Sequence, residues 1–144
     1  MLIRKMEYKD ISWVAKIEQE NFSMPWSENA FSDSLSQREA LFLVAEEDGI
    51  GLGYIGVYIS LDEGEITNVS VERNQRKKGI GNALVERLKQ TLAEEKVERI
   101  FLEVRVSNEP AIGLYEKQGF EKVGCRKGFY EKPREDAWVM MCNL

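Results

Sequence analysis

The most informative absence from this sequence is histidine, of which there is none in 144 residues. Hydrolysis by a Ser-His-Asp triad and zinc sites with histidine ligands are therefore both excluded. Any general base has to be a Glu, Asp, Lys, Tyr or Cys side chain, or water. The two cysteines, Cys125 and Cys142, lack metal-site spacing and are too few for a disulfide framework. In a cytosolic protein both are expected to be reduced.

Long apolar runs are also missing. No apolar segment approaches the ~20 residues that a membrane-spanning helix needs. Met1 to Asp10 alternates charged and apolar residues and lacks the apolar centre of a secretory signal. We therefore expect a cytoplasmic protein without a membrane partner. The net charge of −5 does not favour nucleic acid as a partner, and nothing in the sequence indicates an oligomeric state.

What is present is the composition of a soluble globular protein, with 43% hydrophobic and 31% charged residues. The length is typical of one domain and sufficient for a hydrophobic core. Because the chain contains no linker, repeat or low-complexity tract, we expect residues 1–144 to form a single domain.

Residue periodicity predicts a mixed order of elements. Apolar residues at helical spacing, such as Ile80, Leu84 and Leu88, indicate a long amphipathic helix, whereas alternation from Arg99 to Val106 indicates a strand with Glu103 opposite its apolar face. The expected helices span about 10–22, 27–37, 79–95 and 108–119, and the expected strands about 2–6, 41–47, 53–60, 65–72, 99–106, 120–130 and 136–144. This order favours an α/β fold of the α+β type with a largely antiparallel sheet.

Two glycine motifs require opposite interpretations. Gly51, Gly53 and Gly56 satisfy GxGxxG, but the segment leads into a strand, whereas the dinucleotide fingerprint must open a helix. A glycine-rich hairpin turn is the better interpretation. In the second motif, residues 76–81, a strand precedes and a helix follows, so free N–H groups and basic side chains can face an anion. An ordinary basic helix start explains the second motif equally well, and a nucleic-acid patch is a third option.

With R-x-x-G-x-G between a strand and a helix, the sequence resembles the GCN5-related N-acetyltransferase (GNAT) superfamily. Within it, the sequence is similar to the ribosomal-protein-alanine acetyltransferases (RimI type). That similarity involves Pro25-Trp26-Ser27, residues 65–71, residues 102–108, Ala111, Leu114-Tyr115, Gly119-Phe120 and residues 126–137. The matches are distributed over nearly the whole chain. Two residues depart from the family pattern, since Phe129 stands where a tyrosine is usual and Met24 where a histidine is frequent.

The resemblance implies a GNAT-like sheet flanked by helices, with splayed central strands and acetyl-CoA as co-substrate. The implied cofactor-binding residues are Val69, Ser70, Val71, Arg76, Lys77, Lys78, Gly79, Ile80, Gly81, Asn82 and Asn108, with the pyrophosphate held by residues 75–81. A backbone N–H at the splayed strand would stabilise the oxyanion. No metal is expected. Asn108 also has a simpler explanation, as the N-cap of its helix.

The resemblance also implies the catalytic and acceptor residues. Glu103 faces the substrate cleft and acts as the general base, directly or through water, and Tyr115 protonates the departing thiolate. The competing interpretations are a solvated Glu103 paired with Arg105 or Arg126, and a tyrosine that only packs. Trp26 and Tyr130 shape the amine pocket, or serve merely as hydrophobic anchors.

The function favoured by these observations is acetylation of a protein N-terminus by direct attack on acetyl-CoA. The family-implied substrate is the N-terminal alanine of a small-subunit ribosomal protein. An α-amine, with a reference pKa near ~8 against ~10.4 for lysine, is easier to deprotonate near neutral pH. The alternatives are a lysine or small-molecule amine as acceptor, or a non-catalytic acetyl-CoA-binding module. A covalent route through either cysteine has no flanking base in the sequence.

Overall fold

A computed structural model describes all residues, 1–144, and contains one seven-stranded sheet in the order β1-β2-β3-β4-β5-β7-β6. The strands are β1 (Leu2–Lys5), β2 (Ala40–Glu47), β3 (Ile50–Ser60), β4 (Glu63–Val71), β5 (Arg99–Arg105), β6 (Glu121–Glu131) and β7 (Arg134–Asn143). The helices are α1 (Ile11–Asn21), α2 (Glu28–Leu35), α3 (Ile80–Glu94) and α4 (Glu109–Lys117), with short 3₁₀ turns at Tyr8–Asp10 and Arg73–Gln75. Neighbouring strands pair antiparallel except β4 with β5, which confirms the predicted fold class.

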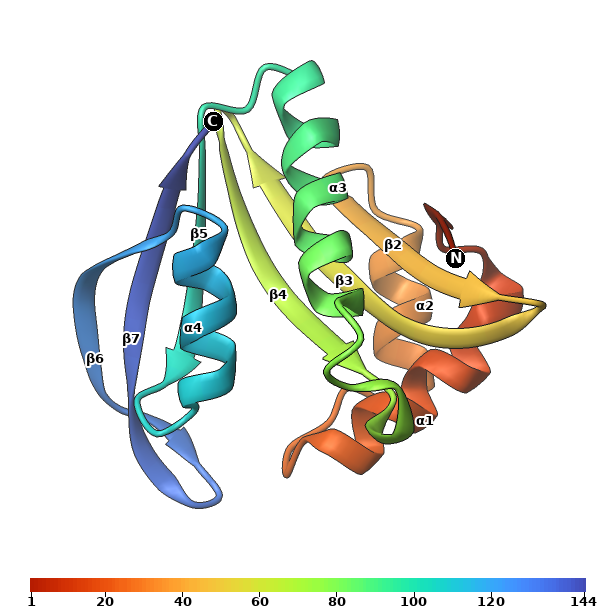
Figure 1. The fold of residues 1–144 in the computed structure, drawn as a ribbon, viewed down its shortest axis with the longest axis horizontal. Coiled ribbons are helices and arrows are strands. Elements are labelled where there is room, and N and C mark those ends of the chain that lie inside the picture. Colours follow the sequence, from red (N-terminus) through yellow and green to blue (C-terminus); the bar gives the residue numbers. More distant parts are fainter.

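Helices cover both faces of the sheet, α3 and α4 on one and α1 and α2 on the other (Figure 1). The larger of the two buried clusters lies beneath α3 and α4 and includes the predicted helical stripe of Ile80, Leu84, Leu88 and Leu92. The smaller one lies beneath α1 and α2, where Phe31 packs edge-on against Phe42 and Tyr54. The sheet therefore separates two apolar cores, one on each face.

The rejected glycine motif lies inside β3, which confirms that it opens no helix. The hairpin turn itself is at Asp48 and Gly49, before the motif, so the three motif glycines are strand residues. Packing explains two of the glycines. A Cβ on Gly51 would lie 2.5 Å from the ring of Trp13, and one on Gly56 would overlap the ring of Phe42. These glycines let aromatic side chains lie flat on the strand.

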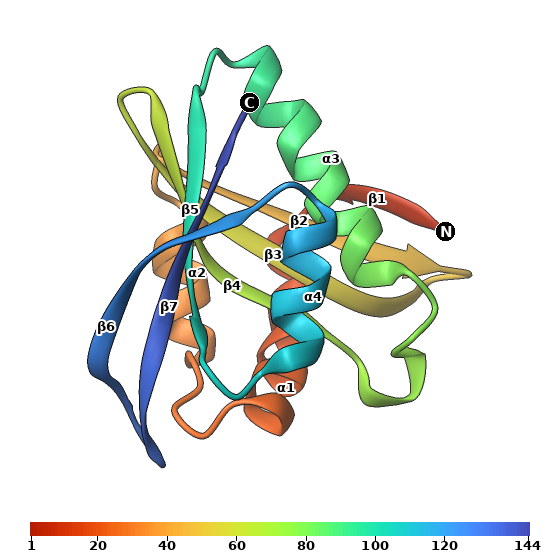
Figure 2. The same cartoon turned by 60° about the vertical axis from the view of Figure 1, so that its left-hand side comes forward.

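The central pair of strands separates along its length. β4 and β5 pair only at Glu63–Arg99, Gly64–Ile100 and Glu65–Phe101. Beyond these positions a bulge interrupts the pairing of β4 with β3 near Thr67, and β4 and β5 diverge toward their carboxyl ends (Figure 1). The helices α3 and α4 both begin at this open end (Figures 1 and 2). The predicted splay of the central strands is confirmed.

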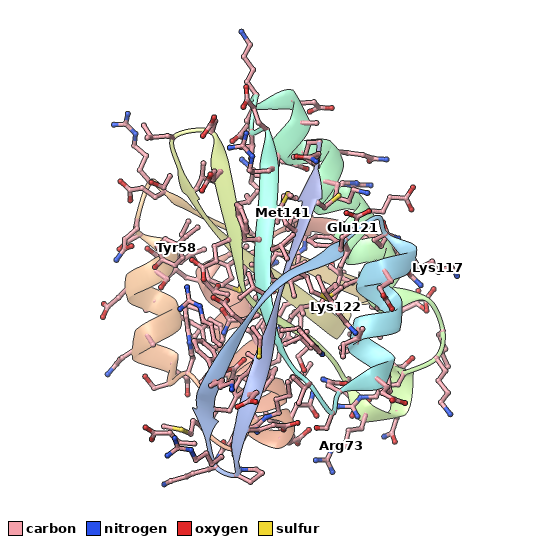
Figure 3. The ribbon with its side chains drawn as sticks, turned by 90° about the vertical axis from the view of Figure 1, so that its left-hand side faces the viewer. Tyr58, Arg73, Lys117, Glu121, Lys122 and Met141 are labelled. Carbon is pink, nitrogen blue, oxygen red and sulfur yellow. The ribbon has the colours of Figure 1, made fainter.

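The β6–β7 hairpin forms the outer edge beyond β5. Figure 3 looks onto this edge, where Glu121 and Lys122 of β6 lie near Met141 of β7. Arg105 at the end of β5 holds the hairpin tip, because its Nη1 donates to the Pro133 carbonyl at 2.9 Å and to Glu135 at 3.1 Å. No helix in the structure is both long and apolar enough to cross a membrane.

Candidate active site

The segment that opens α3 presents a row of free backbone N–H groups. Lys77 and Gly79 both have left-handed backbone conformations, with φ of 64° and 80°. These conformations turn the chain so that no N–H from Lys77 to Asn82 donates to an acceptor in the protein. The first that does is the N–H of Ala83, which donates to the Gly79 carbonyl at 3.0 Å. Free N–H groups at a helix N-terminus favour an anion.

The surroundings of this segment also fit a phosphate group. A Cβ on Gly79 would meet nothing within 4 Å, so the backbone there is open to a ligand. Arg73, Arg76 and Lys78 hydrogen-bond only to neutral oxygens, on Glu20, Asn21 and Gln75, and their charges remain uncompensated. The predicted residues from Arg76 to Asn82 thus form one positively charged surface that is rich in hydrogen-bond donors.

The carboxyl end of β4 directs backbone groups into the split. Since the Glu72 N–H donates to Leu52 on β3, alternation turns the N–H and C=O of Ser70 toward β3 and those of Val69 and Val71 away from it. The Val71 carbonyl is already occupied by Asn21 Nδ2 at 3.1 Å. The buried Ser70 hydroxyl also bonds to Asn21 and thus faces α1. Of the three predicted residues, Val69 has the freest backbone toward the split.

Glu103 lies on β5, on the face opposite the α3 and α4 core, as its alternation predicts. Only 13% of its side chain is exposed. Burial and the neighbouring Glu65 carboxylate raise the pKa of Glu103, and the Arg126 guanidinium partly opposes this shift. Arg126 Nε lies 3.7 Å from Glu103 Oε1, whereas Arg105 pairs with Glu135 instead. Glu103 is therefore a poorly solvated carboxylate with one loose partner.

Tyr115 lies on α4 with a buried ring, 5.7 Å from the ring of Phe120. Its hydroxyl makes no hydrogen bond within the protein. Since Asn68 Oδ1 is the only side-chain polar atom that is both sealed from solvent and unpaired, the Tyr115 hydroxyl must reach the surface. Burial and the nearby Tyr130 raise the pKa of Tyr115, so the hydroxyl keeps its proton. The ring packs as the structural interpretation expects, and the hydroxyl remains available.

Tyr130, near the end of β6, lies within electrostatic reach of both residues. Burial, opposed by Arg105 and reinforced by Glu103, raises the pKa of Tyr130 to about 12. The Arg105 guanidinium stacks over its ring at 4.3 Å from the centroid, and the ring of Phe129 lies 5.0 Å away. Arg105 holds the hairpin tip and stacks on Tyr130, so Tyr130 lies on the same side of β5 as Glu103.

Two further predicted residues have structural partners. The Trp26 ring packs against Phe31 at 5.3 Å and Phe42 at 6.2 Å, as a hydrophobic anchor would. The Asn108 side chain accepts a hydrogen bond from the Ala111 N–H at 3.3 Å and so caps α4, as expected. Its Nδ2 makes no hydrogen bond in the structure and remains available to a ligand.

Sequence reasoning missed three polar residues around the site. Glu65 shares a strand face with Glu103 through the parallel pairing of β4 with β5, which no local pattern reveals. Glu18 and Asn21 on α1 reach β4, about fifty residues away. One signal was available, because Glu18 falls on the apolar side of α1, where an unpartnered carboxylate is costly. No group of three or more Cys, Asp or Glu side chains is arranged to hold a metal ion.

Comparison with known proteins identifies one family and a group of similar bacterial enzymes. A family model described as "Acetyltransferase (GNAT) family" matches residues 7–120. A Bacillus subtilis protein, provisionally named [ribosomal protein bS18]-alanine N-acetyltransferase, is 38% identical over 99% of this chain and 95% of its own. The Escherichia coli [ribosomal protein bS18]-alanine N-acetyltransferase is 34% identical over 96% of this chain and 94% of its own.

A solved structure of the Escherichia coli enzyme has the same fold as this chain. The crystal structure of the ribosomal-protein-S18-alanine N-acetyltransferase from Escherichia coli superposes with a TM-score of 0.91 at 32% identity, covering 99% of this chain and 92% of that one. The similarity therefore includes the β6–β7 hairpin, which lies beyond the residues that the family model matches.

Proposed function

The chain belongs to the acetyltransferase (GNAT) family, and we propose that it transfers the acetyl group of acetyl-CoA to the N-terminal α-amine of a protein. The names of its bacterial relatives favour the N-terminal alanine of ribosomal protein bS18 as the acceptor. The observation that carries the proposal is the split between β4 and β5. Free N–H donors lie at one side of its open end, and a carboxylate of raised pKa lies at the other.

In this proposal the residues of the α3 start hold acetyl-CoA by its pyrophosphate. The N–H groups from Lys77 to Asn82 donate to the phosphate oxygens, and Arg76, Lys77 and Lys78 supply charge. The backbone of Val69 and the N–H of Val71 continue the pairing pattern of β4 toward the pantetheine arm, and Asn108 Nδ2 meets it from α4. Bound acetyl-CoA supplies an activated thioester carbonyl.

The proton transfers are assigned to side chains on either side of the split. Glu103 accepts a proton from the acceptor ammonium, directly or through a water, because its raised pKa brings its basicity closer to that of the amine. Tyr115 donates the proton that the thiolate requires, since it is protonated at neutral pH and has no other acceptor. A backbone N–H of β4 stabilises the oxyanion.

The surroundings of Glu103 also support an amine as acceptor. Glu65 and Glu103 provide negative charge where an ammonium group approaches, and Tyr130 lies near Glu103. An α-amine needs less help to lose its proton than a lysine does, by roughly two pKa units. One partly compensated carboxylate is therefore a sufficient base for an N-terminus.

The test is incubation with acetyl-CoA and a panel of peptides that differ only in their first residue, with products read by mass spectrometry. An N-terminally blocked copy of each peptide serves as the control. We expect acetylation of the alanine-starting peptide and none of its blocked copy. Modification of lysine side chains or of small amines alone would assign the enzyme a different acceptor.

A further inference from the structure

Glu18 is a buried carboxylate that the proposed chemistry does not use. It lies on the last turns of α1 with 3% of its surface exposed. One oxygen, Oε2, accepts a hydrogen bond from the Trp26 N–H at 2.9 Å. The other, Oε1, accepts from the Tyr54 hydroxyl on β3 and from Asn68 Nδ2 on β4, the latter at 3.4 Å. The loop that follows α1 and two strands distant in sequence thus converge on one side chain.

A carboxylate in this position needs an explanation, because burying a charge without a cationic partner is costly. No Lys or Arg side chain forms an ion pair with Glu18, and its only compensation is three neutral donors. An apolar side chain would fill the same space without that cost. What it would lack is an acceptor for the Trp26 N–H, which belongs to the α1–α2 loop and has no other partner.

The α1–α2 loop, residues 22–27, lies at the open end of the β4–β5 split, on the side of the β6–β7 hairpin (Figures 1 and 2). Pro25 precedes Trp26, and the Trp26 ring is fixed against Phe31 and Phe42. The bond from Trp26 to Glu18 therefore fixes the loop backbone at the same residue. The bond from Asn68 to Glu18 joins Glu18, and through it the loop, to β4 immediately after the bulge.

We propose that Glu18 is a positioning residue of the acceptor site, which holds the α1–α2 loop against β4 through the Trp26 N–H so that the acceptor amine is presented at the split. It touches neither the acceptor nor the cofactor. The proposal rests on the proposed function, in that it assumes that the acceptor enters between this loop and the β6–β7 hairpin. The function that it assigns to Glu18 requires an acceptor atom and no proton transfer.

The variants are chosen to remove the hydrogen-bond acceptor and the charge of Glu18 separately. Glu18→Gln keeps an oxygen for the Trp26 N–H, and its new N–H₂ can donate to the Tyr54 oxygen. Asn68 can also turn its amide, which would bring the unpaired Oδ1 toward the new donor. Glu18→Leu preserves size and removes the acceptor, and Glu18→Asp keeps the charge but shortens the side chain by one methylene. Tyr54→Phe is the matched control, because it removes a bond from Glu18 without touching the loop.

Two readouts follow the loop and the acceptor separately. Hydrogen exchange of peptides covering residues 22–31 reports the Trp26 N–H, and steady-state kinetics give KM for the acceptor against kcat. For Glu18→Leu and Glu18→Asp we expect faster exchange in this segment and an acceptor KM raised on the order of tenfold, the effect of one lost buried hydrogen bond. The acetyl-CoA dissociation constant is expected to stay unchanged, which also shows that the variants are folded. Glu18→Gln and Tyr54→Phe are expected to keep the wild-type KM.

Equal loss in Glu18→Gln and Glu18→Leu would overturn the proposal, because the charge and not the acceptor atom would then matter. An unchanged KM in Glu18→Leu despite faster exchange would overturn it as well. If Glu18→Leu does not fold, Glu18→Asp decides by the same two criteria. Failure of the proposed function has a different signature, since wild-type enzyme would then acetylate some other amine, and the KM comparison would be made with that acceptor.

Discussion

Glu103 combines burial with a like charge, and both effects raise the pKa of its carboxyl group. Glu103→Gln is expected to lower kcat by about 10²–10⁴-fold, the usual contribution of a general base, with little change in acetyl-CoA affinity. The raised folded-state pKa means that ionisation opposes folding, so this group favours stability below its unfolded pKa and loses that contribution as pH rises through the folded value. The variant should therefore be at least as stable as wild type at neutral pH. Unfolding in urea and steady-state rates check both, and a wild-type kcat would contradict the role of Glu103.

The raised pKa of Glu103 predicts that a substitution at Glu65 shifts the pH dependence of the reaction rate. Glu65 is the charged neighbour that raises the pKa of Glu103, so Glu65→Gln should shift the acid limb of the kcat/KM profile to lower pH. Glu63→Gln is the control, since Glu63 lies on the same strand but pairs with Arg99. Identical profiles for wild type and Glu65→Gln would show that another group controls the rate.

The ring of Tyr115 packs in the core, whereas its hydroxyl is the proposed proton donor, so the two roles can be tested separately. Tyr115→Phe retains the ring that packs on Phe120 and removes a hydroxyl that has no partner in the protein. Stability is therefore expected to change by less than about 1 kcal/mol, while kcat falls by about 10²-fold or more. Thermal unfolding and initial rates measure the two effects, and an active Tyr115→Phe enzyme would require a different acid.

At the scale of elements, the glycine that opens α3 shares its left-handed conformation and open surroundings with a second glycine. Gly79 and Gly49 have φ of 80° and 79°, and a Cβ on either would meet nothing within 4 Å. Alanine at either position should cost about 1–2 kcal/mol of stability through left-handed strain alone. Only Gly79→Ala is expected to weaken acetyl-CoA binding, because Gly49 lies in the distant β2–β3 turn (Figure 1). Calorimetry on both variants tests this, and equal cofactor affinity would contradict the assignment of the loop.

Arg4 and Asp10 join β1, α1 and β2, because Asp10 binds Arg4 and Trp13 and Arg4 also binds Glu46. Burial would raise the pKa of Asp10, but hydrogen bonds from Arg4, the Glu7 N–H and Trp13 outweigh it and lower the pKa to about 2. Asp10 is 2% exposed, so this shift corresponds to about 2 kcal/mol of stability, present above pH ~4 and lost as the pH falls toward 2. Asp10→Asn should be less stable than wild type by that amount at neutral pH, and the difference should vanish near pH 2. A difference that persisted in acid would mean that Asp10 acts through packing instead of charge.

The elements themselves were largely predictable from the sequence. Helix and strand bounds agree within about three residues, because caps at Ser27 and Asn108 and the leucine stripe of α3 are local signals. The spatial neighbours were not predictable in the same way. The contacts of Glu18 with β3 and β4 and of Glu65 with Glu103 depend on strand order, which local patterns do not encode.

At the scale of the whole molecule, the chain begins and ends in the same sheet, with β1 at one edge and the β6–β7 hairpin at the other. We propose that residues 1–144 form a single N-acetyltransferase domain, held together across the split by α3, α4 and their shared core. One cooperative unfolding transition is expected, with coincident midpoints by circular dichroism and tryptophan fluorescence. Two separated transitions would divide the β6–β7 side from the rest.

We propose that this enzyme acetylates an N-terminal α-amine at the split between β4 and β5. The most direct measurement uses one peptide that begins with alanine and contains an internal lysine, incubated with isotopically labelled acetyl-CoA and followed by tandem mass spectrometry. The label is predicted on the alanine nitrogen, with none on the lysine and none in the Glu103→Gln reaction over the same time. Label on the lysine while the alanine stays free would contradict the account.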